Sequence, residues 1–277
     1  MSSVRDRAGG DLLVGAPVRI GERARPVAVE LGRIQAVRLA RHPLVLVALA
    51  WIGLGTVLGG DYGPRTMFSL VTDLPTFLLG PLVFFAANLL ASRERRHGNE
   101  EWLDSMPAPD AHRTAAAQVA VVGPVALASG LVLAVFAVAV STDQFVSTPS
   151  ALEVASGLLP LLGGGLLGVM VARWLPWPGA AALVMAALVV LHIWLNDRYE
   201  LFGAYVEWAA WPANGDGSVW AGLAPGSRGW HVAYLLALCA MAATGAHLVH
   251  ARRKLPVLAL GGAFIAVAAL AGWAQMP

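Results

Sequence analysis

The chain contains seven apolar runs, each long enough to cross a lipid bilayer as a helix. The hydrocarbon layer takes roughly 17–25 helical residues, and inside it every backbone polar group must be bonded within the protein. The runs cover residues 43–60, 74–91, 114–140, 152–172, 179–195, 230–249 and 255–273. We therefore expect an all-α, polytopic membrane bundle of six to seven transmembrane helices. The third run is long enough to extend into the cytosol.

Composition supports the same class. Hydrophobic residues make up 57% of the 277 residues and charged residues only 13%, whereas about a quarter of a soluble domain is charged. The single cysteine, Cys239, lies in an apolar run, which excludes an intrachain disulfide and a cysteine-based zinc site. Alanine and glycine are abundant and Lys254 is the one lysine, a bias typical of a GC-rich bacterial genome.

Basic residues predict the orientation. Residues 1–25 lack a long apolar core and a small-residue cleavage site, so we interpret them as a cytosolic tail. With that tail inside, eleven basic residues fall in internal loops from Arg33 onward and three in external loops, Arg65, Arg198 and Arg228. We expect a multi-pass protein of the bacterial cytoplasmic membrane with a cytosolic N-terminus. Seven spans would place Pro277 outside.

Two further stretches have the composition of interfacial segments. Residues 27–42 carry Glu30, Arg33, Arg38 and Arg41 among aliphatic residues, which suits a helix lying at the membrane surface before the first span, although the polar residues do not gather on one face. Residues 196–229 form a long external segment with an aromatic residue at every third position from 199 to 211. It predicts an interfacial or re-entrant helix, or an aromatic belt with no role in transport.

The longest strongly charged segment between apolar runs covers residues 93–113. Basic residues followed by Gly98 predict the end of one helix, and Asn99, Glu100 and Glu101 predict the start of a short helix that ends at Met106 before Pro107. Asp110 is placed to cap the next long helix. So short a helix is marginal alone and needs a surface to dock on, either a partner protein or lipid headgroups.

This segment resembles the loop that follows the second span in bacterial ABC-2-type exporter permeases. The residues that carry the resemblance are Glu94-Arg95, Gly98, Glu101, Leu103 and Pro107. The layout of apolar runs over about residues 26–275 is also similar, so the resemblance implies a permease domain over residues 26–277. The chain departs from the family at Asn99, where threonine is commoner, and in having a seventh run.

The resemblance implies a coupling helix within residues 92–113 that sits in a cleft of a cytosolic ATPase. The coupling residues would be Glu94, Arg95, Gly98, Asn99, Glu100, Glu101, Trp102, Leu103, Met106 and Pro107. It also implies two ATPase copies that hold ATP and Mg, and a second permease, identical or related. A substrate path lined by the second run, with Phe77, Phe84 and Asn88, and by the fifth run is placed by the family as well.

The chain itself lacks the motifs of an ATPase. A P-loop needs Gly-Lys-Ser/Thr, but the one lysine is flanked by Arg253 and Leu255, so ATP hydrolysis would belong to a separate chain. Gly163, Gly165 and Gly168 match the letters of a dinucleotide fingerprint, yet they lie inside an apolar run without a preceding strand. Helix packing by small residues, with Gly164 and Gly168 in a GxxxG contact, is the favoured interpretation. We expect no cofactor in this chain and no nucleic-acid partner.

Other candidate sites are weaker. His247 and His250 share a helix side and could hold a metal with His97 or His112, but no acid stands beside them and a structural role near a helix C-terminus is favoured. His192 and His231 are expected at the outer interface. No carboxylate lies near the centre of a run; Glu153 and Asp73 only flank runs. This weighs against a proton-driven carrier, and the missing HExxH motif weighs against a metalloprotease.

The function that these observations favour is the membrane-spanning permease of an ATP-binding-cassette exporter for a hydrophobic or amphipathic cargo. Two alternatives remain open. The first is a membrane scaffold or signalling subunit that docks a cytosolic protein through the same charged segment and transports nothing. The second is a secondary carrier. An adjacent reading frame encoding GxxxxGK[ST] would favour the exporter.

Overall fold

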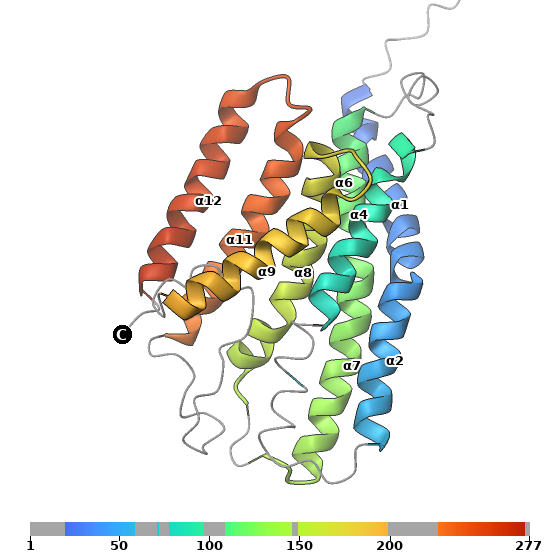
Figure 1. The fold of residues 1–277 in the computed structure, drawn as a ribbon. Helices are drawn as coiled ribbons and strands as arrows, with labels where there is room; N and C mark the ends of the chain where they lie inside the picture. The colour runs from blue at the N-terminus through green and yellow to red at the C-terminus, as the bar shows by residue number, and fades with distance from the viewer. Residues whose placement is uncertain are drawn as a thin grey trace, which may run out of the picture.

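The computed structural model of the chain describes residues 20–58, 71, 78–96, 109–145, 149–198 and 227–274 (Figure 1). No strand occurs in these ranges, so the expected all-α fold is confirmed for them. Each predicted apolar run overlaps one helix, except that the third run forms two. The helices are α1 (Ile20–Ala40), α2 (Pro43–Leu58), α4 (Gly80–Arg96), α6 (Asp110–Ala120), α7 (Val122–Ser141), α8 (Ala151–Trp174), α9 (Ala180–Arg198), α11 (Arg228–Leu248) and α12 (Lys254–Ala274).

Only some of these helices are long and apolar enough to cross a membrane. Within the described ranges four pass this test, namely α8, α11, α12 and the continuous stretch Asp110–Ser141 that comprises α6 and α7. Helices α1 and α2 pass it together as a pair bent by 53°, which would make a fifth span. The chain is therefore a helical membrane protein with four to five candidate spans, and the predicted total of six to seven is not confirmed.

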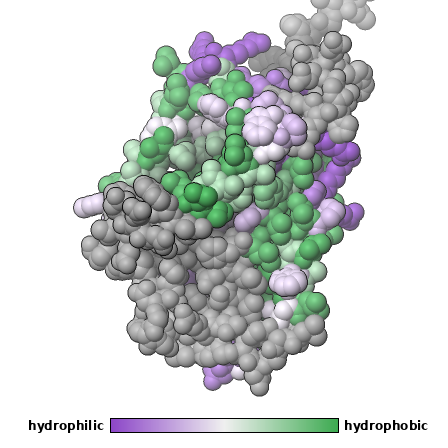
Figure 2. Space-filling model, viewed as in Figure 1, coloured by the Kyte–Doolittle hydropathy of each residue, from purple (hydrophilic) through white to green (hydrophobic). Residues whose placement is uncertain are grey.

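The outer surface has the composition expected next to lipid. Helix α12 packs against α11 and exposes Leu255, at 81%, and Trp273, at 68%. Helix α2 likewise exposes Val47 and Trp51. Figure 2 shows hydrophobic residues spread over the visible face and hydrophilic residues gathered at its upper end and along its right edge. Apolar exposure on this scale is unusual for a soluble monomer and suits side chains that contact acyl chains.

The third run lies within one long helical stretch, Asp110–Ser141, that has a break about a third of the way along it. The 32 residues of this stretch would extend about 48 Å as a helix, well beyond the roughly 30 Å of a hydrocarbon layer. Helix α6 ends at Ala120 and α7 begins at Val122, two residues before Pro124. Proline has no N–H to donate to the carbonyl of Ala120, which explains why the helix breaks here. An upright rod would therefore extend past the membrane at one end.

Helix α8 is the central helix of the bundle, and it approaches α4 backbone to backbone. A Cβ added to Gly164 would lie 2.7 Å from the carbonyl oxygen of Gly80, and one added to Gly168 would collide with the carbonyl oxygen of Phe84. The amide Nδ2 of buried Asn88 donates to the carbonyl oxygen of Gly168 at 3.1 Å. The predicted GxxxG packing contact of Gly164 and Gly168 is thus confirmed.

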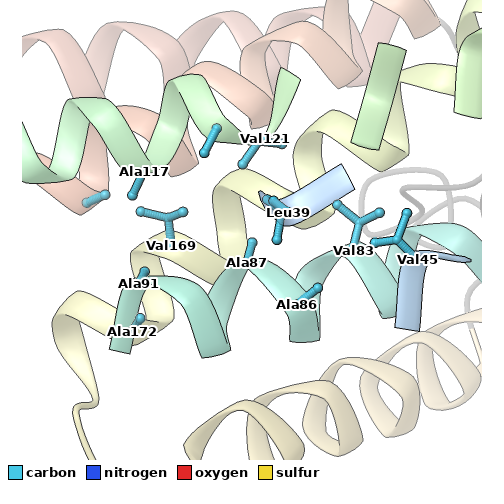
Figure 3. Close-up of a cluster of buried hydrophobic side chains, with 12 residues drawn as sticks. Leu39, Val45, Val83, Ala86, Ala87, Ala91, Ala117, Val121, Val169 and Ala172 are labelled. Carbon is cyan, nitrogen blue, oxygen red and sulfur yellow. The ribbon is translucent and has the colours of Figure 1, made fainter. Parts of the chain in front are cut away.

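A core of small side chains surrounds this contact. The cluster joins α1, α2, α4, α6, α8 and α11 (Figure 3). Its members are mostly alanine and valine: Leu39, Val45, Val83, Ala86, Ala87, Ala91, Ala117, Ala120, Val121, Val169, Ala172 and Ala246. In a membrane, apolar burial gives helices little reason to associate, so close van der Waals packing by small residues has to supply the attraction. The composition of this core fits that requirement.

Helix α1 does not stand apart from the bundle. It begins at Ile20, inside the stretch predicted as tail, and packs on α6 and α7. A Cβ on Gly32 would lie 2.7 Å from that of Val119, and one on Gly123 would collide with the carbonyl of Ala36. The predicted interfacial position of this helix stays a prediction.

His42 marks the bend between α1 and α2. Its Nδ1 accepts a hydrogen bond of 3.3 Å from the backbone N–H of Leu44, in the first turn of α2. Only an unprotonated Nδ1 can accept.

The α4–α8 contact predicts different effects for two glycine substitutions. Gly168→Ala should lower the free energy of unfolding by about 1–3 kcal/mol, because the new methyl group meets backbone that cannot move aside independently. Gly262→Ala on α12 is the matched control, since a Cβ there meets nothing within 4 Å. Thermal unfolding of both variants in detergent measures the difference. Equal stability of the two would contradict the close approach.

Candidate functional site

The predicted coupling segment lies between α4 and α6. Helix α4 ends at Arg96 and α6 begins at Asp110, in agreement with the predicted helix end and restart. Glu94 and Arg95 lie in the last turn of α4. The remaining predicted coupling residues fall outside the described residues: Gly98, Asn99, Glu100, Glu101, Trp102, Leu103, Met106 and Pro107. The short helix expected at 100–106 is among them, and both predictions stand untested.

The start of α6 differs from the expectation in one respect. Pro109, not Asp110, occupies the N-cap position, and no side chain caps the helix. Asp110 is the first helical residue, where its charge is favoured by the helix dipole. Its carboxylate instead forms an ion pair with Arg113 one turn later and a second contact, 3.5 Å long, with Nδ1 of His250. The predicted capping role of Asp110 is therefore wrong.

A set of polar contacts, which we name the polar junction, joins α6 to the end of α11. The side chain of Gln118 donates from Nε2 to the carbonyl oxygen of Ala243 at 2.8 Å. Its Oε1 lies 3.1 Å from Nε2 of His247, which therefore donates to it. The junction comprises Asp110, Arg113, Gln118, His247 and His250. The polar junction thus attaches α6, which follows the predicted coupling segment, to α11, which lies more than a hundred residues later in the sequence.

Helix α8 reaches the same end of the bundle. The indole N–H of Trp174 donates to the carbonyl oxygen of Gly245 at 2.9 Å, and the preceding residue, Arg173, is only 4% exposed. The last turn of α8 thus contacts α11 beside the polar junction. His247 and His250 bind Gln118 and Asp110 respectively, and the described residues hold no group of three or more side chains placed to bind a metal.

A second polar contact joins the start of α8 to the start of α11, at the ends of these helices that lie away from the polar junction. Glu153 at the start of α8 is buried and forms a reciprocal capping box with Ser150. Its other carboxylate oxygen forms an ion pair with Nε of Arg228, the first residue of α11, at 2.7 Å. Sequence reasoning placed Glu153 only at the flank of a run. The Ser-x-x-Glu spacing of a capping box, residues 150–153, was the signal that would have predicted it.

The prediction that His231 reaches out to the membrane interface is wrong, because its side chain is buried at 2% exposure. Its ring centroid lies 6.3 Å from that of Tyr234, which is also buried. One turn of α11 separates the two, so their rings lie next to each other on the same helix face, with their planes tilted by 36°. The side chain of His192 lies outside the described residues.

The residues predicted to line a substrate path lie in helix contacts where they are described. Phe84 is fully buried, its ring 5.3 Å from that of Phe85, and it clusters with Val171 of α8 and Ala180 and Ala181 at the start of α9. Asn88 is buried against Gly168. Phe77 lies outside the described residues. These contacts describe packing, and a role in a path stays a prediction.

Comparisons of the chain with protein-family models, with curated proteins and with solved structures find no match.

The polar junction predicts energetic coupling between two side chains. Gln118→Leu and His247→Leu should each destabilise the protein, because each leaves the other side chain's polar group without its partner in a half-buried place. The free energy of unfolding of the double variant should then fall by about 0.5–3 kcal/mol less than the sum of the decreases in the two single variants. Unfolding of all four proteins in one detergent gives the cycle. Additive losses would show that the contact carries no energy.

Proposed function

We propose that this chain is the membrane-spanning permease subunit of an ATP-binding-cassette exporter. The observation that carries the proposal is the charged segment between α4 and α6, whose Glu94-Arg95, Gly98, Glu101, Leu103 and Pro107 follow the pattern of ABC-2-type permeases. Helix α4 meets it from one side and α6 from the other, in a chain of which only 13% is charged. A short charged segment held between two membrane helices is suited to transmit movement from a cytosolic partner.

The packing of the two flanking helices supports a mechanical role. Helix α4 meets α8 backbone to backbone at Gly164 and Gly168, so a displacement of α4 would move α8 with it. Helix α6 is tied to α11 through Gln118. Movement of the segment would therefore reach the central helix by one route and α11 by the other. Contacts of this kind transmit motion because packed helices move as rigid bodies.

The proposed assembly follows from the same resemblance. The chain would lie in the bacterial cytoplasmic membrane with its N-terminus in the cytosol, beside a second permease, identical or related. Two cytosolic ATPases would bind ATP and Mg, since the chain has no P-loop. Their closure would displace residues 97–108. The cargo would be hydrophobic or amphipathic, in keeping with the apolar spans.

Reversing charge in the segment should break the link to the ATPase. Tagged wild-type chain and the variants Glu101→Arg and Gly98→Pro are expressed in the source bacterium and purified in mild detergent. We expect wild-type chain to recover a P-loop ATPase with ATP hydrolysis, and both variants to recover at least about tenfold less, a loss typical of truncating an interface anchor. Immunoblotting of membranes checks that each variant is inserted.

The matched control is Glu30→Arg, which reverses an exposed acid on α1, outside the segment. It should recover the ATPase as the wild type does. Recovery of the ATPase at wild-type levels by Glu101→Arg and Gly98→Pro would contradict the coupling role. Recovery of a protein other than an ATPase by the wild type would favour a scaffold or signalling subunit instead.

A further inference from the structure

The outward face of α1 is basic and lies beside a lipid-exposed helix. Arg33, Arg38 and Arg41 are exposed there, and between them lie the exposed apolar side chains of Ile34 and Val37. The opposite face of the same helix is packed on α6 and α7 through the close contacts of Gly32 and Gly123. This packing holds the three arginines on the side that points away from the bundle.

Among the residues that the structure describes, no ion pair joins Arg33, Arg38 or Arg41 to an acid. Glu30 is the only acid in residues 28–58, so this face carries a net positive charge. Arg38 and Arg41 lie one helical turn apart, on the same side of α1, so both can reach a single anion. Guanidinium groups suit phosphate because their planar N–H donors match its oxygens in pairs.

The position of the arginines indicates where that phosphate would come from. Arg41 comes two residues before Pro43, where α2 begins, and α2 exposes Leu46, Val47 and Trp51. In Figure 2 the hydrophilic residues at the right edge, at the height of α1, border the hydrophobic surface below them. The boundary between an apolar span and a basic stretch is the level at which lipid headgroups lie.

We propose that the outward face of α1 binds the phosphate groups of anionic phospholipids, with Arg38 and Arg41 as the principal contacts and Arg33 beside them. The site favours an anionic lipid over a zwitterionic one, because the choline group of phosphatidylcholine brings a positive charge against the arginines. This inference does not depend on the exporter function.

Lipid retention measured by native mass spectrometry tests the proposal. The full-length chain is purified in detergent and incubated with equal amounts of phosphatidylglycerol and phosphatidylcholine, and the retained lipids are counted. Each basic side chain near an anionic surface strengthens attachment by about fivefold. We expect the wild-type chain to retain phosphatidylglycerol preferentially. Replacing Arg33, Arg38 and Arg41 together by Gln should lower that preference by at least about tenfold.

Two further variants make the result specific. Replacing the same three arginines by Lys keeps their charge, and should keep the preference within about threefold of the wild type, since lysine also binds phosphate. Replacing Arg252, Arg253 and Lys254 by Gln removes three exposed charges from the turn between α11 and α12. These residues are consecutive and do not have the spacing of one helix face, so this variant should retain most of the preference. Circular dichroism and thermal unfolding establish that each variant is folded.

Three results would overturn the proposal. The first is an unchanged preference in the Gln variant of α1. The second is an equal loss in the variant of the α11–α12 turn, which would show a diffuse attraction to any basic turn. The third is an equal retention of both lipids by the wild type. If the Gln variant fails to fold, Arg38→Gln alone replaces it, and its expected loss is about fivefold.

Discussion

The structure depends on the close approach of α8 to α4. Gly164 and Gly168 present no side chain to the backbone of Gly80 and Phe84, and Asn88 adds a hydrogen bond to the carbonyl oxygen of Gly168. In an apolar solvent, helices attract one another through tight packing and buried hydrogen bonds, and this contact has both. Because α8 also packs on α6, α7, α9 and α11, the contact positions the rest of the bundle.

Polar contacts hold the two ends of α8 to α11. At one end Glu153 binds Arg228 and caps α8 with Ser150, and at the other Trp174 donates to the carbonyl oxygen of Gly245. The polar junction adds α6 to this second end through Gln118. Polar groups in a membrane protein need partners within the protein, so their pairing selects one arrangement of these helices over others. The charged segment between α4 and α6 thus lies between two helices that are each held in the bundle, α4 by α8 and α6 by α11.

Apolar runs predicted the helices well because length and composition alone decide whether a segment can be helical in lipid. The GxxxG spacing of Gly164 and Gly168 predicted a contact, although not its partner α4. The packing of α1 on α6 could not be predicted, since Gly32 and Gly123 have no pattern in common and lie far apart in the chain. The contact of Asp110 with His250 could not be predicted either, because the two residues lie far apart in the sequence and come together only in the folded chain.

Some of the contacts that were not predicted join residues close in the sequence, and others join residues far apart. The capping box of Ser150 and Glu153 is visible in the sequence, whereas its link to Arg228 is not. His231 looked interfacial because it lies near the end of a run, but the neighbouring helices cover it. The coupling residues were predicted from the resemblance of one segment to the loop of ABC-2-type permeases. Their roles concern contacts with a partner protein, which the packing within this chain does not test.

Site-specific photo-cross-linking from position 102 would test the account most directly. A photoreactive phenylalanine analogue replaces Trp102 in the predicted coupling helix, and replaces the exposed Trp51 of α2 in a control chain. After irradiation of intact cells, mass spectrometry identifies what each position has captured. We expect capture of a P-loop ATPase at position 102 and none at position 51. Capture at position 102 of a protein without a P-loop, or of lipid alone, would contradict it.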